Sequence, residues 1–176
     1  MEIYTPALEQ AEKLADKTGM GPALNCIGIV YYNRGEYDKA LEYYDKSLKI
    51  KEEIGDKRGM GYSLLNIGNL HTNKGEYDKA FEYYVRSLKI KEELGDKLGM
   101  GLALGNIGNV HQNRGEYNKA LEYYDRTLKI QEEIGDKSGV GYTLNSIGIA
   151  YYNAGDYNKA AEYLEKSLTI HKEIGF

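Results

Sequence analysis

Residues 57–96 read KRGMGYSLLNIGNLHTNKGEYDKAFEYYVRSLKIKEELGD, and this pattern returns along the chain every 40 residues. Two successive copies, aligned from Gly61 and from Gly101, agree at 26 of 40 positions without a gap. A fixed period of this length is typical of repeat proteins, in which each copy packs on its neighbours. The sequence therefore predicts a single array over residues 1–176. Its predicted segments are a partial repeat at 1–16 and four repeats at 17–56, 57–96, 97–136 and 137–176.

Each repeat contains two stretches in which apolar residues return at helical spacing. Gly75 between them can adopt the left-handed conformation, and Asp96, which follows Gly95, is a typical N-cap for the next helix. Because the links are short, consecutive helices are expected to pack antiparallel. The first helices are expected at about 57–73 and 97–113, and the second at about 76–94 and 116–134. Glycines are predicted to lie opposite alanines where the helices approach closely, at Gly28, Gly68, Gly108 and Gly148 and at Ala40, Ala80, Ala120 and Ala160.

Composition excludes several classes of function. The chain has 23 basic and 27 acidic residues, so it lacks the excess positive charge with which proteins bind nucleic acid. Its single cysteine, Cys26, cannot form an internal disulfide, and residues 1–13 lack the apolar core of a signal peptide, so a cytoplasmic location is expected. No apolar run of about 18 residues occurs, and no membrane span is predicted.

One copy of the repeat carries a recognisable pattern of large apolar and small residues. It stands as Leu24, Ile27-Gly28, Tyr31, Gly35, Tyr37, Ala40, Tyr44 and Ser47-Leu48, and it recurs in all four copies. This pattern resembles the tetratricopeptide repeat. The resemblance implies an all-α, right-handed superhelical solenoid of antiparallel helix pairs. The period of 40, longer than the usual 34, is similar to that of arrays in spindle-orientation adaptors and prokaryotic regulators, which bind extended peptides in a concave groove.

The resemblance also implies that the first helix of each repeat lines the inner face. On that helix Tyr62, Asn66, Asn69 and Asn73 follow spacings of 4, 3 and 4 and so share one face. The windows 21–33, 61–73, 101–113 and 141–153 contain no Asp, Glu, Lys or Arg. Asparagine both donates and accepts hydrogen bonds, so this face suits an uncharged peptide backbone. The predicted peptide-binding residues are Tyr62, Asn66, Asn69, Asn73, Leu102, Asn106, Asn109, Asn113 and Tyr142.

A second interpretation of these asparagines stays open. They can tie neighbouring helices together, and Asn73 and Asn113 precede a glycine turn, where asparagine is favoured for local capping. Asn69 and Asn109 are the better candidates for binding, because the outer copies carry isoleucine at the same position.

The histidines and the cysteine give no chemistry of their own. His71 and His111 stand where other copies have tyrosine, which predicts packed, hydrogen-bonded core residues. They lack a third ligand at helical spacing, so no metal site is predicted, and Cys26 is expected to be a small buried apolar residue. The sequence predicts neither a catalytic set nor a cofactor, and the chain is not expected to be an enzyme.

The function predicted from the sequence is a scaffold that binds a protein or peptide ligand. Two alternatives remain: a sensor or regulatory segment of a larger signalling or transcription regulator, and a self-associating structural array. In the second case copies would join end to end, because the repeats begin and end without a polar capping helix. The contact face at the C-terminal end is expected to include Tyr157, Ala161 and Leu164.

Overall fold

A computed structural model describes residues 16–175, and the regular structure in that part of the chain consists of eight helices. The chain divides into two compact units, Met1–Ile90 and Lys91–Phe176, with the boundary inside a helix. The predicted partial repeat at 1–16 falls, except for its last residue, outside the described residues. The helices are α2 (Lys17–Asn33), α3 (Tyr37–Glu53), α4 (Lys57–Asn73), α5 (Tyr77–Glu93), α6 (Lys97–Asn113), α7 (Tyr117–Glu133), α8 (Lys137–Asn153) and α9 (Tyr157–Glu173).

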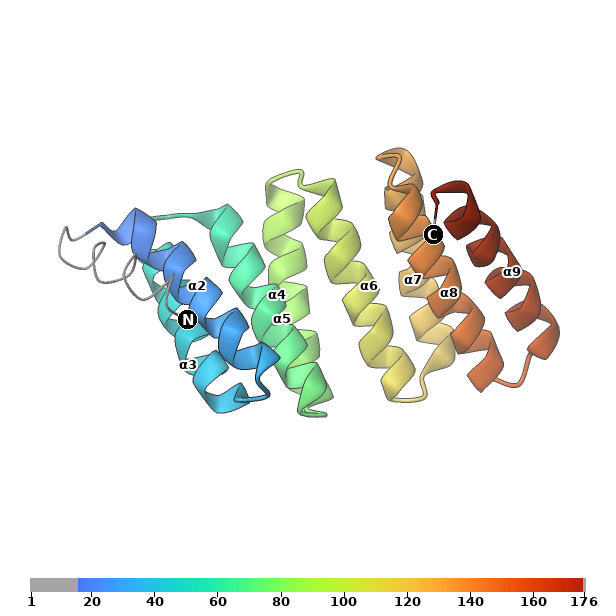
Figure 1. Ribbon diagram of the computed structural model, residues 1–176, viewed down its shortest axis with the longest axis horizontal. Coiled ribbons are helices and arrows are strands. Elements are labelled where there is room, and N and C mark those ends of the chain that lie inside the picture. The colour runs from blue at the N-terminus through green and yellow to red at the C-terminus, as the bar shows by residue number, and fades with distance from the viewer. Residues whose placement is uncertain (1–15, 176) are drawn as a thin grey trace. The chain divides into compact units, whose positions relative to one another are not determined.

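These bounds agree with the predicted ones to within one residue. Within the first unit, α2 packs antiparallel on α3, and α3 packs on α4 (Figure 1). The second unit repeats this order, with α6 on α7, α7 on α8 and α8 on α9. The first helices of adjacent repeats also touch, α2 with α4 and α6 with α8. Each unit therefore has a row of first helices and a row of second helices.

The helix ends are formed as the sequence predicts. Asp96 caps α6 by accepting a hydrogen bond from the Gly99 backbone N–H at 3.0 Å, and Asp56 and Asp136 cap α4 and α8 in the same way. Gly75, at the turn between the two helices of a repeat, has φ of 73°, in the left-handed region. Short turns of this kind bring the second helix back against the first.

A tyrosine ring fills the space beside a glycine in the middle of three of the first helices, α2, α4 and α6. A Cβ atom built on Gly68 would lie 2.5 Å from Cε1 of Tyr84, and Gly28 and Gly108 face tyrosine rings at the same distance. The predicted contact with alanine is present as well, at Gly28 and at Gly148, although a larger side chain lies closer. The backbone oxygen of Ala40 is 3.3 Å from the Cβ built on Gly28, so the closest neighbour is the tyrosine. The missing side chain makes room for a large ring and lets the backbone of the second helix approach.

A buried polar layer joins adjacent repeats within each unit. The Nζ of Lys51 on α3 donates to Oγ of Ser63 on α4 at 2.9 Å. At the same repeat position in the second unit, Oε1 of Gln131 on α7 accepts from Oγ1 of Thr143 on α8 at 2.8 Å. Each bond ties a second helix to the first helix that follows it.

Lysine is costly at such a position because its charge is buried. Burial lowers the pKa of Lys51, and the nearby Asp56 carboxylate opposes that change. Lys91, at the equivalent position two helices on, pairs with Oδ2 of Asp96 at 2.8 Å. The repeats therefore satisfy the same buried position with different partners.

The tyrosine contact gives a test of the packing. We predict that Gly68→Ala lowers the free energy of unfolding by about 1 to 3 kcal/mol, because the added methyl group overpacks the Tyr84 ring. Gly105→Ala is the matched control: its Cβ would meet its nearest neighbour, Thr127, at 3.7 Å, so the better helix propensity of alanine should stabilise by about 1 kcal/mol. Urea unfolding of both variants measures the difference. Equal effects of the two substitutions would contradict the packing described here.

Candidate functional site

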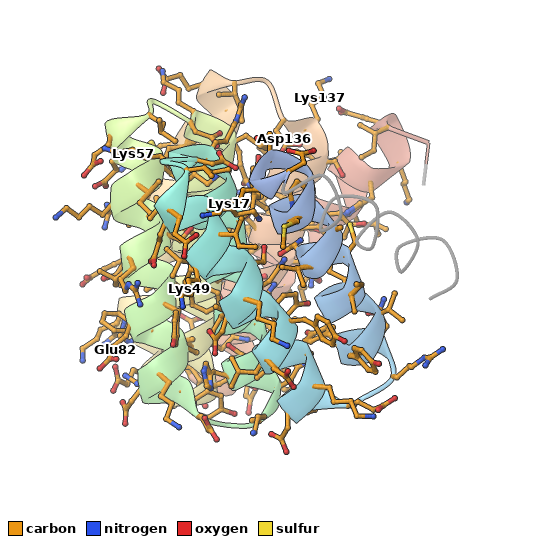
Figure 2. The ribbon with its side chains drawn as sticks, turned by 90° about the vertical axis from the view of Figure 1, so that its left-hand side faces the viewer. Lys17, Lys49, Lys57, Glu82, Asp136 and Lys137 are labelled. Atoms are coloured by element: carbon orange, nitrogen blue, oxygen red, sulfur yellow. The ribbon has the colours of Figure 1, made fainter. Side chains whose placement is uncertain are left out.

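An uncharged stripe runs along the exposed face of the first helices in each unit. Tyr62 in the first unit and Leu102 and Tyr142 in the second are 39%, 49% and 57% exposed, although they are large apolar or aromatic residues. The charged residues lie elsewhere: Figure 2 shows Lys49 and Glu82 on the outer surfaces of α3 and α5. Exposed apolar side chains without neighbouring charge are typical of binding surfaces.

Two of the predicted asparagines in the first unit connect neighbouring first helices. Nδ2 of Asn66 on α4 donates to Oδ1 of Asn25 on α2 at 3.0 Å. Nδ2 of Asn73 donates to the hydroxyl of Tyr32 at 2.7 Å. Asn66 and Asn73 therefore hold neighbouring helices together, as the second interpretation of the asparagines predicts.

Asn69 and Asn109 are held differently, by a tyrosine of their own repeat. The hydroxyl of Tyr84 donates to Oδ1 of Asn69 at 2.7 Å, and the hydroxyl of Tyr124 donates to Oδ1 of Asn109 at the same distance. This bond fixes which end of each carboxamide faces the protein. In Asn109, which is exposed, the oxygen is engaged by Tyr124, and Nδ2 is the other end of the carboxamide.

Burial acts on the supporting tyrosines. It raises the pKa of Tyr84 to about 12, an effect that the hydrogen bond with Thr72 opposes, and it also raises the pKa of Tyr124. Both hydroxyls therefore stay protonated, and able to donate to asparagine, at any physiological pH. The sequence analysis does not identify these tyrosines as supports of the site, because their position in the repeat marks them only as core residues.

A groove in the second unit brings several of the predicted residues together. It encloses about 150 Å³ between α6 and α8, with α7 beneath, and Leu102, Asn106, Asn109 and Tyr142 all line it. Asn113 is exposed but does not line it. The sequence analysis misses the remaining lining residues, which are Gly101, Gly105, Tyr124, Thr127, Gln131, Thr143 and Ser146.

Tyr142 is supported by a residue to which the sequence assigns no role. The ring of His171 on α9 meets the ring of Tyr142 edge-on, with the centroids 5.1 Å apart. The same histidine packs against Gly141, where a Cβ atom would come within 3.0 Å of its ring. His171 therefore helps to position one wall of the groove.

The other histidines are packed as the sequence predicts. His71 is buried, its Nδ1 lies 2.7 Å from Oε2 of Glu76, and its ring stacks on Tyr83 with 5.3 Å between centroids. Hydrogen bonds from Lys79 and then from His71 lower the pKa of the Glu76 carboxyl. His111 makes the same contact with Glu116. These bonds are structural links between the two helices of a repeat.

The described residues offer little else of a chemical kind. Between residues 16 and 175 no three His, Cys, Asp or Glu side chains are placed to share a metal ion. Cys26 is half-buried, which differs from the full burial expected of it, because it stands on the open stripe of α2. Within the same part of the chain, none of the helices has the length and apolar character needed to cross a bilayer.

Comparison with known proteins identifies the family of the repeat. A family model described as "Tetratricopeptide repeat" matches residues 19–93 and 99–173, which is most of the chain. In a comparison with curated proteins, none matches.

Three solved structures share the fold. BtubC (BKLC) from P. vanneervenii has 22% identity and a TM-score of 0.88, over 99% of this chain and 73% of that chain. A Rap protein complexed with Competence and Sporulation Factor has 22% identity and a TM-score of 0.85, over 97% of this chain and 47% of that chain. A STAND protein with a tetratricopeptide repeat sensor, PH0952 from Pyrococcus horikoshii, has 25% identity and a TM-score of 0.84, over 93% of this chain and 26% of that chain. The predicted all-α fold of antiparallel helix pairs is confirmed.

The buried tyrosine hydroxyl predicts a pH dependence. The pKa of Tyr84 is about 12 in the folded chain against 10 as its ordinary value, so its contribution to stability is complete below pH 10 and is lost as the pH rises through 10 toward 12. Tyr84→Phe keeps the ring beside Gly68 but removes the hydroxyl. It should lower the free energy of unfolding by about 0.5 to 1.5 kcal/mol near pH 8, because the hydrogen bond is lost. The difference from the parent chain should become smaller as the pH rises above 10.

Urea unfolding of both proteins at a series of pH values measures this difference. Tyr142→Phe, which removes an exposed hydroxyl, is the control and should follow the parent chain. A gap between Tyr84→Phe and the parent that stays constant from pH 8 to pH 12 would show that the hydroxyl is not held as described.

Proposed function

Because the chain belongs to the tetratricopeptide-repeat family, we propose that it is a protein-interaction module that binds an extended, largely uncharged peptide on the exposed stripe of its first helices. The observation that carries the proposal is the uncharged groove of the second unit, in which Leu102, Asn106, Asn109 and Tyr142 meet. In the first unit the same role falls to Tyr62, Asn66, Asn69 and Asn73, and in the second also to Asn113.

The chemistry of the stripe suits a peptide backbone. Asn109 holds its carboxamide with the oxygen on Tyr124, which leaves Nδ2 to donate to a backbone carbonyl of the ligand. Leu102 and Tyr142 offer apolar contact area, and tyrosine does so at a low cost in side-chain entropy. The charged clamps that hold carboxylates and phosphates need lysine or arginine, which the stripe lacks.

One relative of known structure agrees with this proposal. The Rap protein is complexed with Competence and Sporulation Factor, so a chain with this fold binds a factor. The present chain spans about half the length of that protein, and only the fold is carried over. The ligand class proposed here depends on the residues of this stripe.

A second candidate function is the sensor segment of a larger signalling or transcription regulator. The STAND protein is described as having a tetratricopeptide repeat sensor, and this chain covers 26% of it. The two proposals share the binding face and differ in whether ligand binding changes an attached domain. The complete open reading frame discriminates between them.

The binding proposal predicts the effect of removing the asparagines. We expect Asn109→Ala, alone and with Asn69→Ala, to weaken binding of peptides selected from an uncharged peptide array by about 1 to 3 kcal/mol, the usual cost of leaving a buried partner unsatisfied. The melting temperature should change little, because each tyrosine keeps a second hydrogen-bond partner. Oε1 of Gln112 lies 3.1 Å from the Tyr124 hydroxyl, and Oγ1 of Thr72 lies 3.0 Å from the Tyr84 hydroxyl.

Asn158→Ala, an exposed asparagine on a second helix, is the matched control and should bind as the parent does. If the double variant melts at a much lower temperature while peptides bind it equally well, the asparagines are structural ties and the proposed face is wrong.

A third candidate, the self-associating array, draws on the exposed side of α9. Tyr157 and Leu168 are 64% and 53% exposed there. Leu164 is also exposed, whereas Tyr124, at the same position of the preceding repeat, is buried under α8. The candidate proposes that a helix of a second copy packs on this face in the way that α8 packs on α7.

This candidate predicts that the parent chain associates as its concentration rises and that Leu164→Glu suppresses the association without unfolding the central repeats. Sedimentation velocity over a concentration series measures it. A parent chain that stays monomeric at every concentration would remove the self-association candidate and leave the peptide-binding proposal intact.

A further inference from the structure

A notch in the groove of the second unit exists because residue 105 is glycine. The notch is the part of this groove beside Gly101 and Gly105, between Leu102 of α6 and Tyr142 of α8. The other repeats carry larger residues at the position of Gly105, namely Asn25, Leu65 and Asn145. The third repeat therefore has a local feature that its near-identical neighbours lack.

The floor of the notch presents aliphatic carbon. A Cβ atom built on Gly105 would lie 3.7 Å from Cγ2 of Thr127, and one built on Gly101 would lie 3.7 Å from Cγ2 of Ile130 and 4.0 Å from Cγ of Gln131. These are ordinary van der Waals distances. The two glycines thus bring the backbone of α6 close to apolar atoms of α7, of which Thr127 is itself buried, and leave the space above them free of an α6 side chain.

The polar groups around the notch are turned to partners within the protein. The hydroxyl of Thr143 donates to Oε1 of Gln131 at 2.8 Å, that of Thr127 to the carbonyl of Tyr123 at 3.0 Å, and that of Ser146 to the carbonyl of its own helix at 3.2 Å. No charged side chain lines the notch. A charged group that entered it would lose hydration without gaining an opposite charge, so the notch selects against charge.

The preceding repeat indicates the size of group that this repeat position holds. Leu65 stands there and is 6% exposed, so a leucine side chain is accommodated at that point of the repeat. In the third repeat the corresponding position is Gly105, and the notch stands open beside it. A ligand side chain of similar size would take the place of the leucine side chain that the third repeat lacks.

We infer that the notch is the anchor subsite of the bound peptide and takes one aliphatic side chain of the size of Leu, Ile or Val. This inference rests on the proposed function and adds to it the class of side chain that is recognised. Asn109, which lines the same groove, donates to the backbone of the peptide while the aliphatic group enters the notch. The two contacts together fix the register of the peptide on α6 and α8.

The test uses the whole chain and an array of end-capped, uncharged decapeptides. Each position of the peptides is varied in turn among Leu, Ile, Val, Phe, Asn, Asp and Lys. Peptides that bind should share one position at which Leu, Ile or Val is preferred and Asp and Lys are rejected. Gly105→Leu fills the notch with a side chain of the protein itself. It should lower the affinity for the selected peptides by about tenfold to a hundredfold, the loss expected when a buried aliphatic contact is removed.

Asn145→Leu is the matched control, because it places the same side chain at the same repeat position outside the notch lining. It should leave binding unchanged. The melting temperature of Gly105→Leu should be no lower than that of the parent, because leucine favours helix more than glycine does. If leucine disturbs folding, Gly105→Ala fills less of the notch and serves in its place.

The outcomes separate this inference from the proposed function. Peptides that bind without any aliphatic preference, or that bind Gly105→Leu as tightly as the parent, would overturn the anchor subsite and leave the peptide-binding function standing. An array in which no peptide binds the parent chain would overturn the proposed function, and the anchor subsite with it.

Discussion

The close contact between a large side chain of the second helix, a tyrosine in the first three repeats, and a glycine in the middle of the facing helix is the constraint on which each repeat depends. At 2.5 Å from Cε1 of Tyr84, a Cβ atom on Gly68 has no room, so the first helix carries glycine there despite its low helix propensity. The same tyrosine extends its hydroxyl past the glycine to the carboxamide of Asn69. One side chain therefore sets the spacing of the helix pair and the orientation of a candidate ligand-binding group.

The fourth repeat shows how closely these two roles are linked. Leu164 replaces the tyrosine, and a Cβ atom on Gly148 would lie 2.7 Å from its Cγ, so the close packing is preserved. The hydroxyl is gone, and the asparagine that it would hold is replaced by Ile149. The second and third repeats pair tyrosine with asparagine, and the fourth pairs leucine with isoleucine. The first repeat pairs Tyr44 with Ile29, so the tyrosine packs on the glycine there without an asparagine to hold. The polar character of the stripe is thus concentrated in the two central repeats.

Most of the fold can be predicted from the sequence, and the candidate site only in part. The bounds of α4 and α6 follow from the period, the capping aspartates and the turn glycines, because these are local signals that recur in every copy. The stripe of asparagines follows from helical spacing. The hydrogen bond that orients Asn109 and the notch beside Gly105 do not, because both depend on how neighbouring helices pack on one another. The spacing of residues along one helix does not predict the contacts and open spaces between that helix and its neighbours.

The buried polar layer makes the order of the repeats matter. Lys51 finds the hydroxyl of Ser63 on the following helix, and Gln131 finds that of Thr143, but residue 103, at the corresponding position, is alanine. A rearranged chain that placed the third repeat's glutamine before that alanine would bury an amide without its partner. Copies that agree at 26 of 40 positions are therefore not interchangeable parts. The repeats share one pattern, and the residues that differ at the contacts between repeats determine which repeat can pack next to which.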